Sequence, residues 1–319
     1  MTPPPSDLTA RLGLAPDARA IILNADDFGM CHAANAAITE LLDSGHLDSA
    51  TVMVPCAWAP EALAFAAART DLDVGVHLVL TSEWTDYRWR PLTGTATSLV
   101  DEAGCFPALA RSVEEQADAG DVAAELAAQL QAALDAGVDV THLDNHMGSV
   151  YGLATGRDFL TETLGLAAEH GLPFRLPRFV DGTDLEPSFQ DAATRAAAGA
   201  DALGVVIPDH TWTHPFPLAN EGSDYEETYE EVRGEFLGLL RQVRPGVTEI
   251  FLHPMVDGDE LRAAVDFGAK KRGYERRLLA DPLVQKTIVE EGLVRIGWRA
   301  LRDVQRRQEP GDESRNADT

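Results

Sequence analysis

The stretch Ile21–His32, IILNADDFGMCH, decides how the rest of the chain is interpreted. Apolar residues run into Asn24 and then into two adjacent carboxylates, Asp26 and Asp27. Two neighbouring carboxylates at a buried strand end do not both ionise cheaply unless a positive group meets them. After Phe28-Gly29, an Ala-rich helical pattern begins near His32. The stretch therefore predicts a strand, a turn and a helix, with a charged site where the strand ends.

The same alternation of a short apolar run and a longer helical pattern recurs along the chain. The candidate strands are residues 20–25, 49–55, 74–80, 138–144, 173–177, 203–208, 248–253 and 293–297. Most are apolar on both faces, which favours parallel strands covered by helices. The pattern predicts an α/β fold, a single-domain, distorted (β/α) TIM-like barrel. A doubly wound open sheet is the alternative.

The chain has three predicted parts. Residues 1–19 are Pro-rich and 305–319 are polar without periodicity, so we expect an N-terminal tail and a disordered C-terminal tail around a barrel domain at 20–304. Residues 81–118 are too long for an ordinary strand-to-helix loop, and 179–200 and 208–224 are also irregular. Long loops in a compact domain are usually functional.

Composition excludes several classes of partner. The formal net charge of -26 argues against nucleic acid and anionic membranes. No apolar run reaches the ~20 residues that span a bilayer, and the first residues lack a signal-peptide pattern. Three cysteines without CxxC spacing indicate neither a disulfide framework nor a zinc knuckle. We expect a cytoplasmic protein, for which homo-oligomerisation stays open.

Ionisable residues gather at the ends of the predicted strands. Besides the aspartate pair, they are His77, His142, Asp144, His146, Arg175, Arg178, His210 and His253. In a parallel barrel all of them lie at the carboxyl-terminal face, where active sites of this architecture are built. Stability alone does not explain so many charged strand ends.

A divalent metal ion would supply the positive partner. Two neutral imidazoles and one carboxylate hold such an ion and leave positions for water and substrate. One aspartate would bind the metal and the other would take a proton from water, with a turn at Phe28-Gly29 bringing both carboxylates into the site. Taken alone, the pair also fits helix-capping carboxylates.

The other candidates have alternatives of their own. His77, within an apolar strand, resembles a core histidine when considered alone. In HLDNH, His146 is the expected ligand, His142 could equally be a donor behind the ligands, and Asp144 is a candidate to orient it. Arg175 and Arg178 fit surface or loop pairs equally well.

Together these motifs resemble the YdjC/ChbG family of carbohydrate deacetylases, also labelled ChbG/HpnK. The resemblance rests on NADDFG, GVHLVLT, THLDNH, FRLPR and EIFLHP, in that order, between about Ile21 and Trp298. It implies a distorted (β/α) barrel, one divalent ion (Mg²⁺ or Zn²⁺), and hydrolysis of the N-acetyl group of an amino sugar. It also implies that Asp26 or Asp27, His77 and His146 bind the metal, and that His253 belongs to the site.

One motif departs from the family. Members close to the chitooligosaccharide enzymes continue with several histidines after the aspartate that corresponds to Asp144, whereas Met147 and Gly148 follow His146 here. We therefore expect a substrate preference that differs from plain chitooligosaccharides.

The hypothesis is a metal-dependent hydrolase that removes the N-acetyl group from an acetylated sugar. Asp27, His77 and His146 are assigned to the metal, Asp26 to the general base and His253 to the general acid. Substrate-binding residues complete the assignment: Arg175, Arg178 and, in the 81–118 segment, Trp84 and Trp89, whose rings are suited to stack on a sugar. The alternatives are another metal-assisted hydrolase, acting on phosphoesters or non-sugar amides, and a non-catalytic sugar-binding protein.

Overall fold

A parallel β-sheet forms the centre of the protein. The computed structural model describes residues 6–94, 96–180, 187–213 and 227–307. Its strands are β1 (Arg19–Phe28), β2 (Ser49–Val52), β3 (Asp73–Leu78), β4 (Val140–Asn145), β5 (His210–Thr213), β6 (Gly246–Leu252) and β7 (Val294–Arg295). They are ordered β4-β3-β2-β1-β6-β5, and β7 pairs with the start of β1.

Backbone contacts outside the regular strands connect the two edges of this sheet. Phe174 forms a parallel bridge with Leu143 of β4, and its N–H donates to the carbonyl oxygen of Val206. Farther along, the N–H of Arg178 donates to the carbonyl oxygen of Pro208, just before β5. The sheet therefore curls into a half-barrel that these segments close irregularly. The predicted α/β single domain with a distorted barrel is confirmed.

Two of the predicted strands, 173–177 and 203–208, are not regular strands. Pro173, Pro177 and Pro208 lie within them, and proline has no N–H to donate to a sheet ladder. The distortion of the barrel is concentrated at these two segments.

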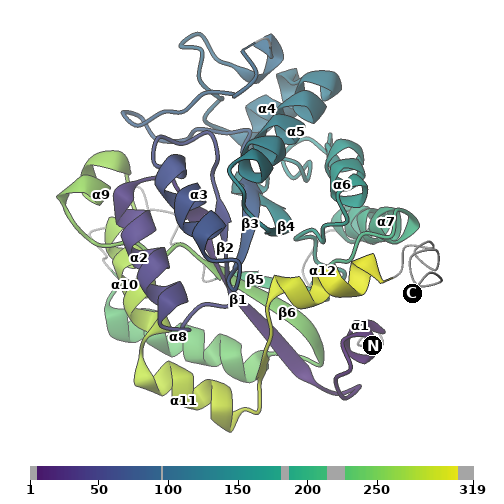
Figure 1. Ribbon diagram of the computed structural model, residues 1–319, viewed down its shortest axis with the longest axis vertical. Helices are drawn as coiled ribbons and strands as arrows, with labels where there is room; N and C mark the ends of the chain where they lie inside the picture. Colours follow the sequence, from purple (N-terminus) through teal and green to yellow (C-terminus); the bar gives the residue numbers. More distant parts are fainter. Residues whose placement is uncertain (1–5, 95, 181–186, 214–226, 308–319) are drawn as a thin grey trace, which may run out of the picture.

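Helices surround the strands (Figure 1). They are α1 (Leu8–Arg11), α2 (His32–Asp43), α3 (Ala59–Ala68), α4 (Ala110–Gln116), α5 (Ala119–Asp135), α6 (Leu160–Glu169), α7 (Pro187–Ala202), α8 (Tyr229–Gln242), α9 (Asp259–Ala264), α10 (Ala269–Leu279), α11 (Pro282–Glu290) and α12 (Trp298–Arg306). Val122, Leu126 and Leu130 of α5 show the principle: spaced four residues apart, they form one buried face.

Both predicted tail boundaries need correction. Leu8 of α1 is buried and packs in a cluster with Trp298 and Val206. Gln305, in α12, is also buried; its side chain accepts a hydrogen bond from the Val206 N–H and donates to the Leu172 carbonyl. The fold therefore includes Leu8–Arg11 and extends to Arg306, while 1–5 and 308–319 lie outside the described residues.

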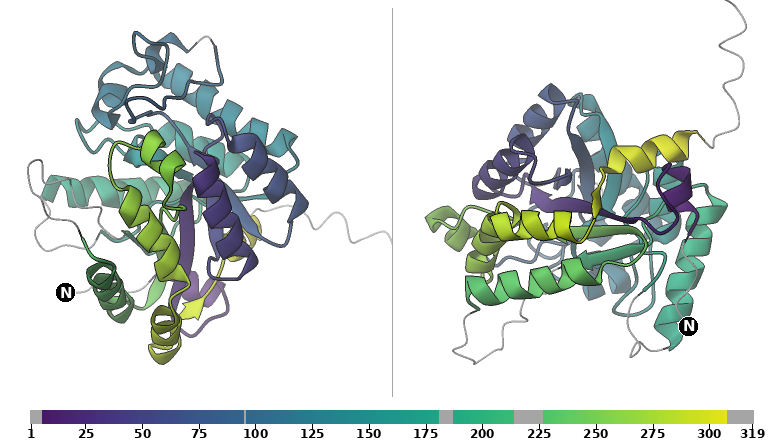
Figure 2. Two further views of the ribbon diagram at one scale, coloured as in Figure 1. Left: turned by 90° about the vertical axis from the view of Figure 1, so that its left-hand side faces the viewer. Right: turned by 90° about the horizontal axis from the view of Figure 1, so that it is seen from below.

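The long segment 81–118 lies at the end of the molecule opposite β7 (Figure 2). It contains a short 3-10 helix (Thr97–Leu99, η1) and α4. Arg88 ties it together by donating to the Asp101 carboxylate (2.8 Å) and to the Phe106 carbonyl (2.6 Å). The segment is thus a folded extension over the carboxyl ends of the strands, where the site forms.

Within the described ranges, no helix combines the length and apolar character that crossing a bilayer requires. The cytoplasmic location stays a prediction, and homo-oligomerisation stays open.

Candidate metal centre and active site

A backbone irregularity at the end of β1 turns both aspartates into one site. The pairing of β1 with β2 shifts register between Ala25 and Phe28, and Asp27 has a positive φ of 65°. Adjacent strand residues normally point to opposite faces, so an irregularity is needed for both carboxylates to face inward. A left-handed conformation costs a residue with a side chain about 1–2 kcal/mol. The change of direction thus begins at Asp27, earlier than the predicted turn at Phe28-Gly29.

Asp27, His77 and His146 bring one ligand atom each to a common point. Asp27 Oδ1 lies 3.7 Å from His77 Nε2 and 3.5 Å from His146 Nδ1, and the two nitrogens are 3.3 Å apart. A point equidistant from these atoms is about 2.0 Å from each, which is the length of zinc–nitrogen and zinc–oxygen bonds. The three side chains therefore fit a divalent ion.

Electrostatics at this point favour a cation. Burial raises the pKa of Asp27, but the neighbouring His146 and His253 outweigh it, so the pKa falls well below its ordinary value. Burial lowers the pKa of His146, whereas Glu83 and Asp27 raise it, to about 10. Asp27 Oδ1 is buried and has no hydrogen-bond partner among the described residues. The negative potential that draws protons to the histidines would also attract a metal ion.

A carboxylate contacts each of the two histidines that could bind a metal. His77 Nδ1 is 2.7 Å from Asp144 Oδ1, and Asp144 Oδ2 accepts a hydrogen bond from Thr51 Oγ1 at 2.8 Å. His146 Nε2 is 2.9 Å from Glu83 Oε2. Asp144 was expected in this role, but it contacts His77. Glu83 was missed, although its position six residues after His77 on the same segment is a signal that sequence alone contains.

Asp26 is held beside the metal ligands by a buried arginine. The Nη atoms of Arg175 donate to both oxygens of Asp26, each at 2.7 Å, and Asn24 Nδ2 donates to Oδ1 at 2.9 Å. Burial raises the pKa of Asp26, but Arg175 and His77 lower it by more, so the pKa lies below its ordinary value. Asp26 is therefore an ionised carboxylate in a fixed orientation.

His253 follows β6 and faces the same carboxylate. Its Nε2 is 4.0 Å from Asp26 Oδ2, and its backbone N–H donates to Glu275 Oε2 at 2.6 Å. Glu275 is fully buried on α10, and burial raises its pKa to about 7. No sequence spacing marked Glu275, because its proximity to His253 depends on how α10 packs.

The family model for YdjC-like proteins matches residues 20–290, which contain all of these groups. The chain belongs to the YdjC-like family. Among its relatives, a carbohydrate deacetylase of Thermus thermophilus is 35% identical over 298 residues, which cover 93% of this chain and 98% of the relative. A carbohydrate deacetylase of Geobacillus stearothermophilus is 38% identical over 282 residues, covering 88% and 97%.

A crystal structure of an Enterococcus faecalis protein is similar to this YdjC-like protein in fold. The two superpose with a TM-score of 0.70 at 25% identity, covering 89% of this chain and 99% of the other. The irregular barrel therefore matches an experimental structure over nearly its whole length.

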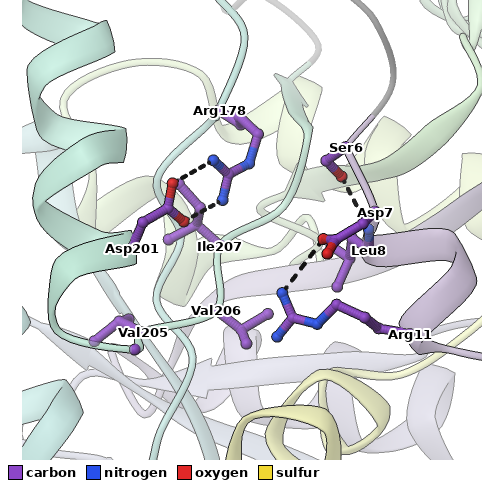
Figure 3. Close-up of a pocket in the computed structure, with 10 residues that line it drawn as sticks. Ser6, Asp7, Leu8, Arg11, Arg178, Asp201, Val205, Val206 and Ile207 are labelled. Atoms are coloured by element: carbon purple, nitrogen blue, oxygen red, sulfur yellow. Dashed lines mark hydrogen bonds and ion pairs between the residues drawn. The ribbon is translucent and has the colours of Figure 1, made fainter. Parts of the chain in front are cut away.

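The two arginines predicted to bind substrate instead pair with carboxylates of this YdjC-like chain. Arg175 is buried and also donates to Glu249 Oε2 at 2.7 Å, so its donors engage carboxylates of the protein. Arg178 forms a two-point pair with Asp201, at 2.7 and 2.9 Å. Figure 3 shows this pair in a pocket that Leu8 and Arg11 also line. We correct both assignments: Arg175 holds Asp26, and Arg178 joins α7 to the preceding segment.

Trp84 and Trp89 are packed inside the protein, with 2% and 4% of their surface exposed. The Trp84 ring contacts Phe267, with ring centres 5.2 Å apart. The indole N–H of Trp89 donates to the Thr81 carbonyl at 2.7 Å, and its ring centre is 6.0 Å from that of His146. The prediction that these rings stack on a sugar is corrected, because their faces are covered by protein.

His142 does not lie behind a metal ligand. Its ring stacks on Trp298 of α12, with centres 4.6 Å apart and an interplanar angle of 4°. Burial, followed by Arg175, lowers its pKa well below the ordinary value. His142 is therefore a neutral core residue, and its predicted role as a donor to the ligands is corrected.

Proposed function

We propose that this protein is a metal-dependent hydrolase that removes the N-acetyl group from an acetylated amino sugar or oligosaccharide. The observation that carries the proposal is the triangle of Asp27, His77 and His146 beside a second buried carboxylate, Asp26. The relatives named carbohydrate deacetylases, which align over nearly the whole chain, support the reaction and the substrate class.

The donor set indicates which ion the site prefers. Two imidazole nitrogens and one carboxylate oxygen suit zinc and similar transition metals, whereas Mg²⁺ prefers oxygen ligands. When bound, such an ion would polarise the amide carbonyl and lower the pKa of water, so that water loses a proton more easily and becomes a better nucleophile. Zn²⁺ is therefore the better candidate of the two ions.

The protein's own residues move the protons. Asp26, ionised and fixed by Arg175, takes a proton from the attacking water as general base. His253 Nε2, 4.0 Å from Asp26 Oδ2, gives a proton to the departing amine nitrogen as general acid. Amide hydrolysis uses both a base and an acid, and a non-catalytic sugar-binding protein has no need of both.

Acetate release tests the proposal. The metal-free protein, the Zn²⁺-loaded protein and the loaded Asp26→Asn variant are incubated with a panel of N-acetylated sugars and with a phosphoester control. We expect acetate only from the loaded wild type. Phosphoester hydrolysis without acetate would establish a different metal-assisted hydrolase, and binding of sugars without any product would establish a sugar-binding protein.

A further inference from the structure

The two histidine ligands and the carboxylates behind them are arranged in a crossed pattern. β3 supplies His77, and the chain that continues from β3 supplies Glu83, which contacts His146. β4 supplies Asp144, which contacts His77, and the next residues supply His146. Each segment thus provides one ligand and the carboxylate that orients the ligand of the other segment.

The geometry at His146 defines which ring nitrogen is free. Nδ1 faces Asp27 Oδ1 (3.5 Å), whereas Nε2 faces Glu83 Oε2 (2.9 Å). A carboxylate accepts hydrogen bonds, so when a metal ion occupies the ligand position Nε2 carries the hydrogen and Nδ1 presents its lone pair to the ion. Glu83 is thus the group that accepts the Nε2–H and holds the ring in this orientation.

Glu83 is held in place by the 81–118 segment. Its neighbour Ser82 is tied down twice: the Ser82 N–H donates to the Pro107 carbonyl (2.9 Å), and Ser82 Oγ accepts from the Trp89 N–H (3.0 Å). On the other side Trp84 is buried. The Glu83 side chain is 12% exposed, so water competes little for its carboxylate.

We propose that Glu83 is a positioning residue that fixes the orientation and tautomer of His146, which makes the 81–118 segment a support of the metal centre. This inference rests on the proposed metal site. It gives the long segment a role in metal affinity that differs from the role of a substrate lid.

Metal affinity separates this role from a catalytic one. Glu83→Ala and Glu83→Gln are compared with Asp86→Asn, which removes the same charge at an exposed position three residues away. The dissociation constant for Zn²⁺ is measured by competition with a chelator. We expect it to rise about 10–100-fold in Glu83→Ala, the usual effect of removing a ligand's partner. The dissociation constant of Glu83→Gln should lie between those of the wild type and Glu83→Ala, because the amide oxygen still accepts a hydrogen bond. That of Asp86→Asn should match the wild type.

Nitrogen NMR of the imidazole rings provides a second readout. The Zn²⁺-loaded wild type should show a hydrogen on Nε2 of His146 and none on Nδ1. In the Zn²⁺-loaded Glu83→Ala variant, the Nε2–H signal of His146 should shift, because its carboxylate acceptor is gone.

The outcomes distinguish the inference from the proposed function. A wild type that binds no divalent ion would refute the metal centre itself. Unchanged Zn²⁺ affinity and an unchanged Nε2–H signal of His146 in both Glu83 variants would refute the role of Glu83 alone. A lower kcat at unchanged affinity would make Glu83 a group that acts on substrate, which also overturns the proposal.

Discussion

Asp144 Oδ1 lies 2.7 Å from His77 Nδ1, across β3 and β4, where the two residues are paired in register. The other oxygen of Asp144 lies 2.8 Å from an Nη atom of Arg175, which also holds Asp26. One carboxylate therefore links a metal ligand to the proposed base. A change at Asp144 is expected to affect both.

Asp144→Asn should weaken metal binding without abolishing it. The amide oxygen of the new side chain would still accept a hydrogen bond from His77 Nδ1–H. The negative charge that makes the imidazole a stronger ligand for the metal is lost. We expect the dissociation constant for Zn²⁺ to rise about 10–100-fold, measured by chelator competition. Asp139→Asn is the control, because Asp139 pairs with Arg302 (2.6 Å) and not with a ligand. An equal loss in both variants would indicate a general charge effect.

Asp26→Asn and Asp27→Asn should have opposite signatures. Asp27 contributes a ligand atom, so its variant should lose the metal, as measured by elemental analysis. Asp26→Asn should keep the metal and lower kcat about 100-fold or more, the usual contribution of a general base. Retention of metal in Asp27→Asn together with its loss in Asp26→Asn would reverse the two roles.

His253 should control the alkaline limb of activity. Burial lowers its pKa below the ordinary value, although Asp27 and Asp26 raise it. An acid must be protonated to donate, so kcat/KM should fall as pH rises through a pKa on the acid side of 6.5. His253→Ala should abolish this limb and harm N-acetyl substrates more than activated esters, whose leaving groups need no proton. Equal damage to both substrates would mean that His253 only positions the substrate.

Replacing Arg175 should lower the free energy of unfolding much more than replacing Arg178. Arg175→Met leaves Asp26, Asp144 and Glu249 without their shared cation in the core, which should cost about 3–5 kcal/mol of unfolding free energy. Arg178→Ala removes a partly exposed pair with Asp201 and should cost at most about 1 kcal/mol. Chemical denaturation of both variants tests this. Similar stabilities of the two variants, with a higher KM in Arg175→Met, would indicate that Arg175 binds substrate after all.

The candidate ligand set was predictable because topology restricts where strand ends go. In a parallel sheet the carboxyl ends of β1, β3 and β4 meet at one edge, so Asp27, His77 and His146 had to lie near one another. Their residue types then indicated a metal. This inference needed no knowledge of side-chain packing, and the structure brings the three together.

The remaining features depend on contacts between distant segments. Arg175 resembles a surface arginine in sequence, and only the closure of the barrel buries it between Asp26 and Glu249. Glu83 reaches His146 only because the 81–118 segment folds back over the strand ends. The positive φ of Asp27 could not be predicted either, because its sequence context suggested a turn that begins one residue later, at Phe28-Gly29.

Trp89 provides the sharpest test of the revised role of the 81–118 segment. A substrate lid would lose affinity for the sugar on truncation and keep its stability. The structure instead buries Trp89 beside His146 and uses its indole N–H on the Thr81 carbonyl. Trp89→Ala should therefore cost about 3–5 kcal/mol of unfolding free energy, as truncation of a buried aromatic does.

The control is Trp58→Ala, at a tryptophan that is 40% exposed and contacts the exposed ring of His32. Trp58→Ala should lower the free energy of unfolding by about 0.5 kcal/mol, as substitutions at other surface positions do. Trp89→Ala should also weaken Zn²⁺ binding, because the packing that holds His146 is lost, whereas Trp58→Ala should not. A Trp89→Ala variant with normal stability and metal affinity and a several-fold higher KM would restore the substrate-lid interpretation.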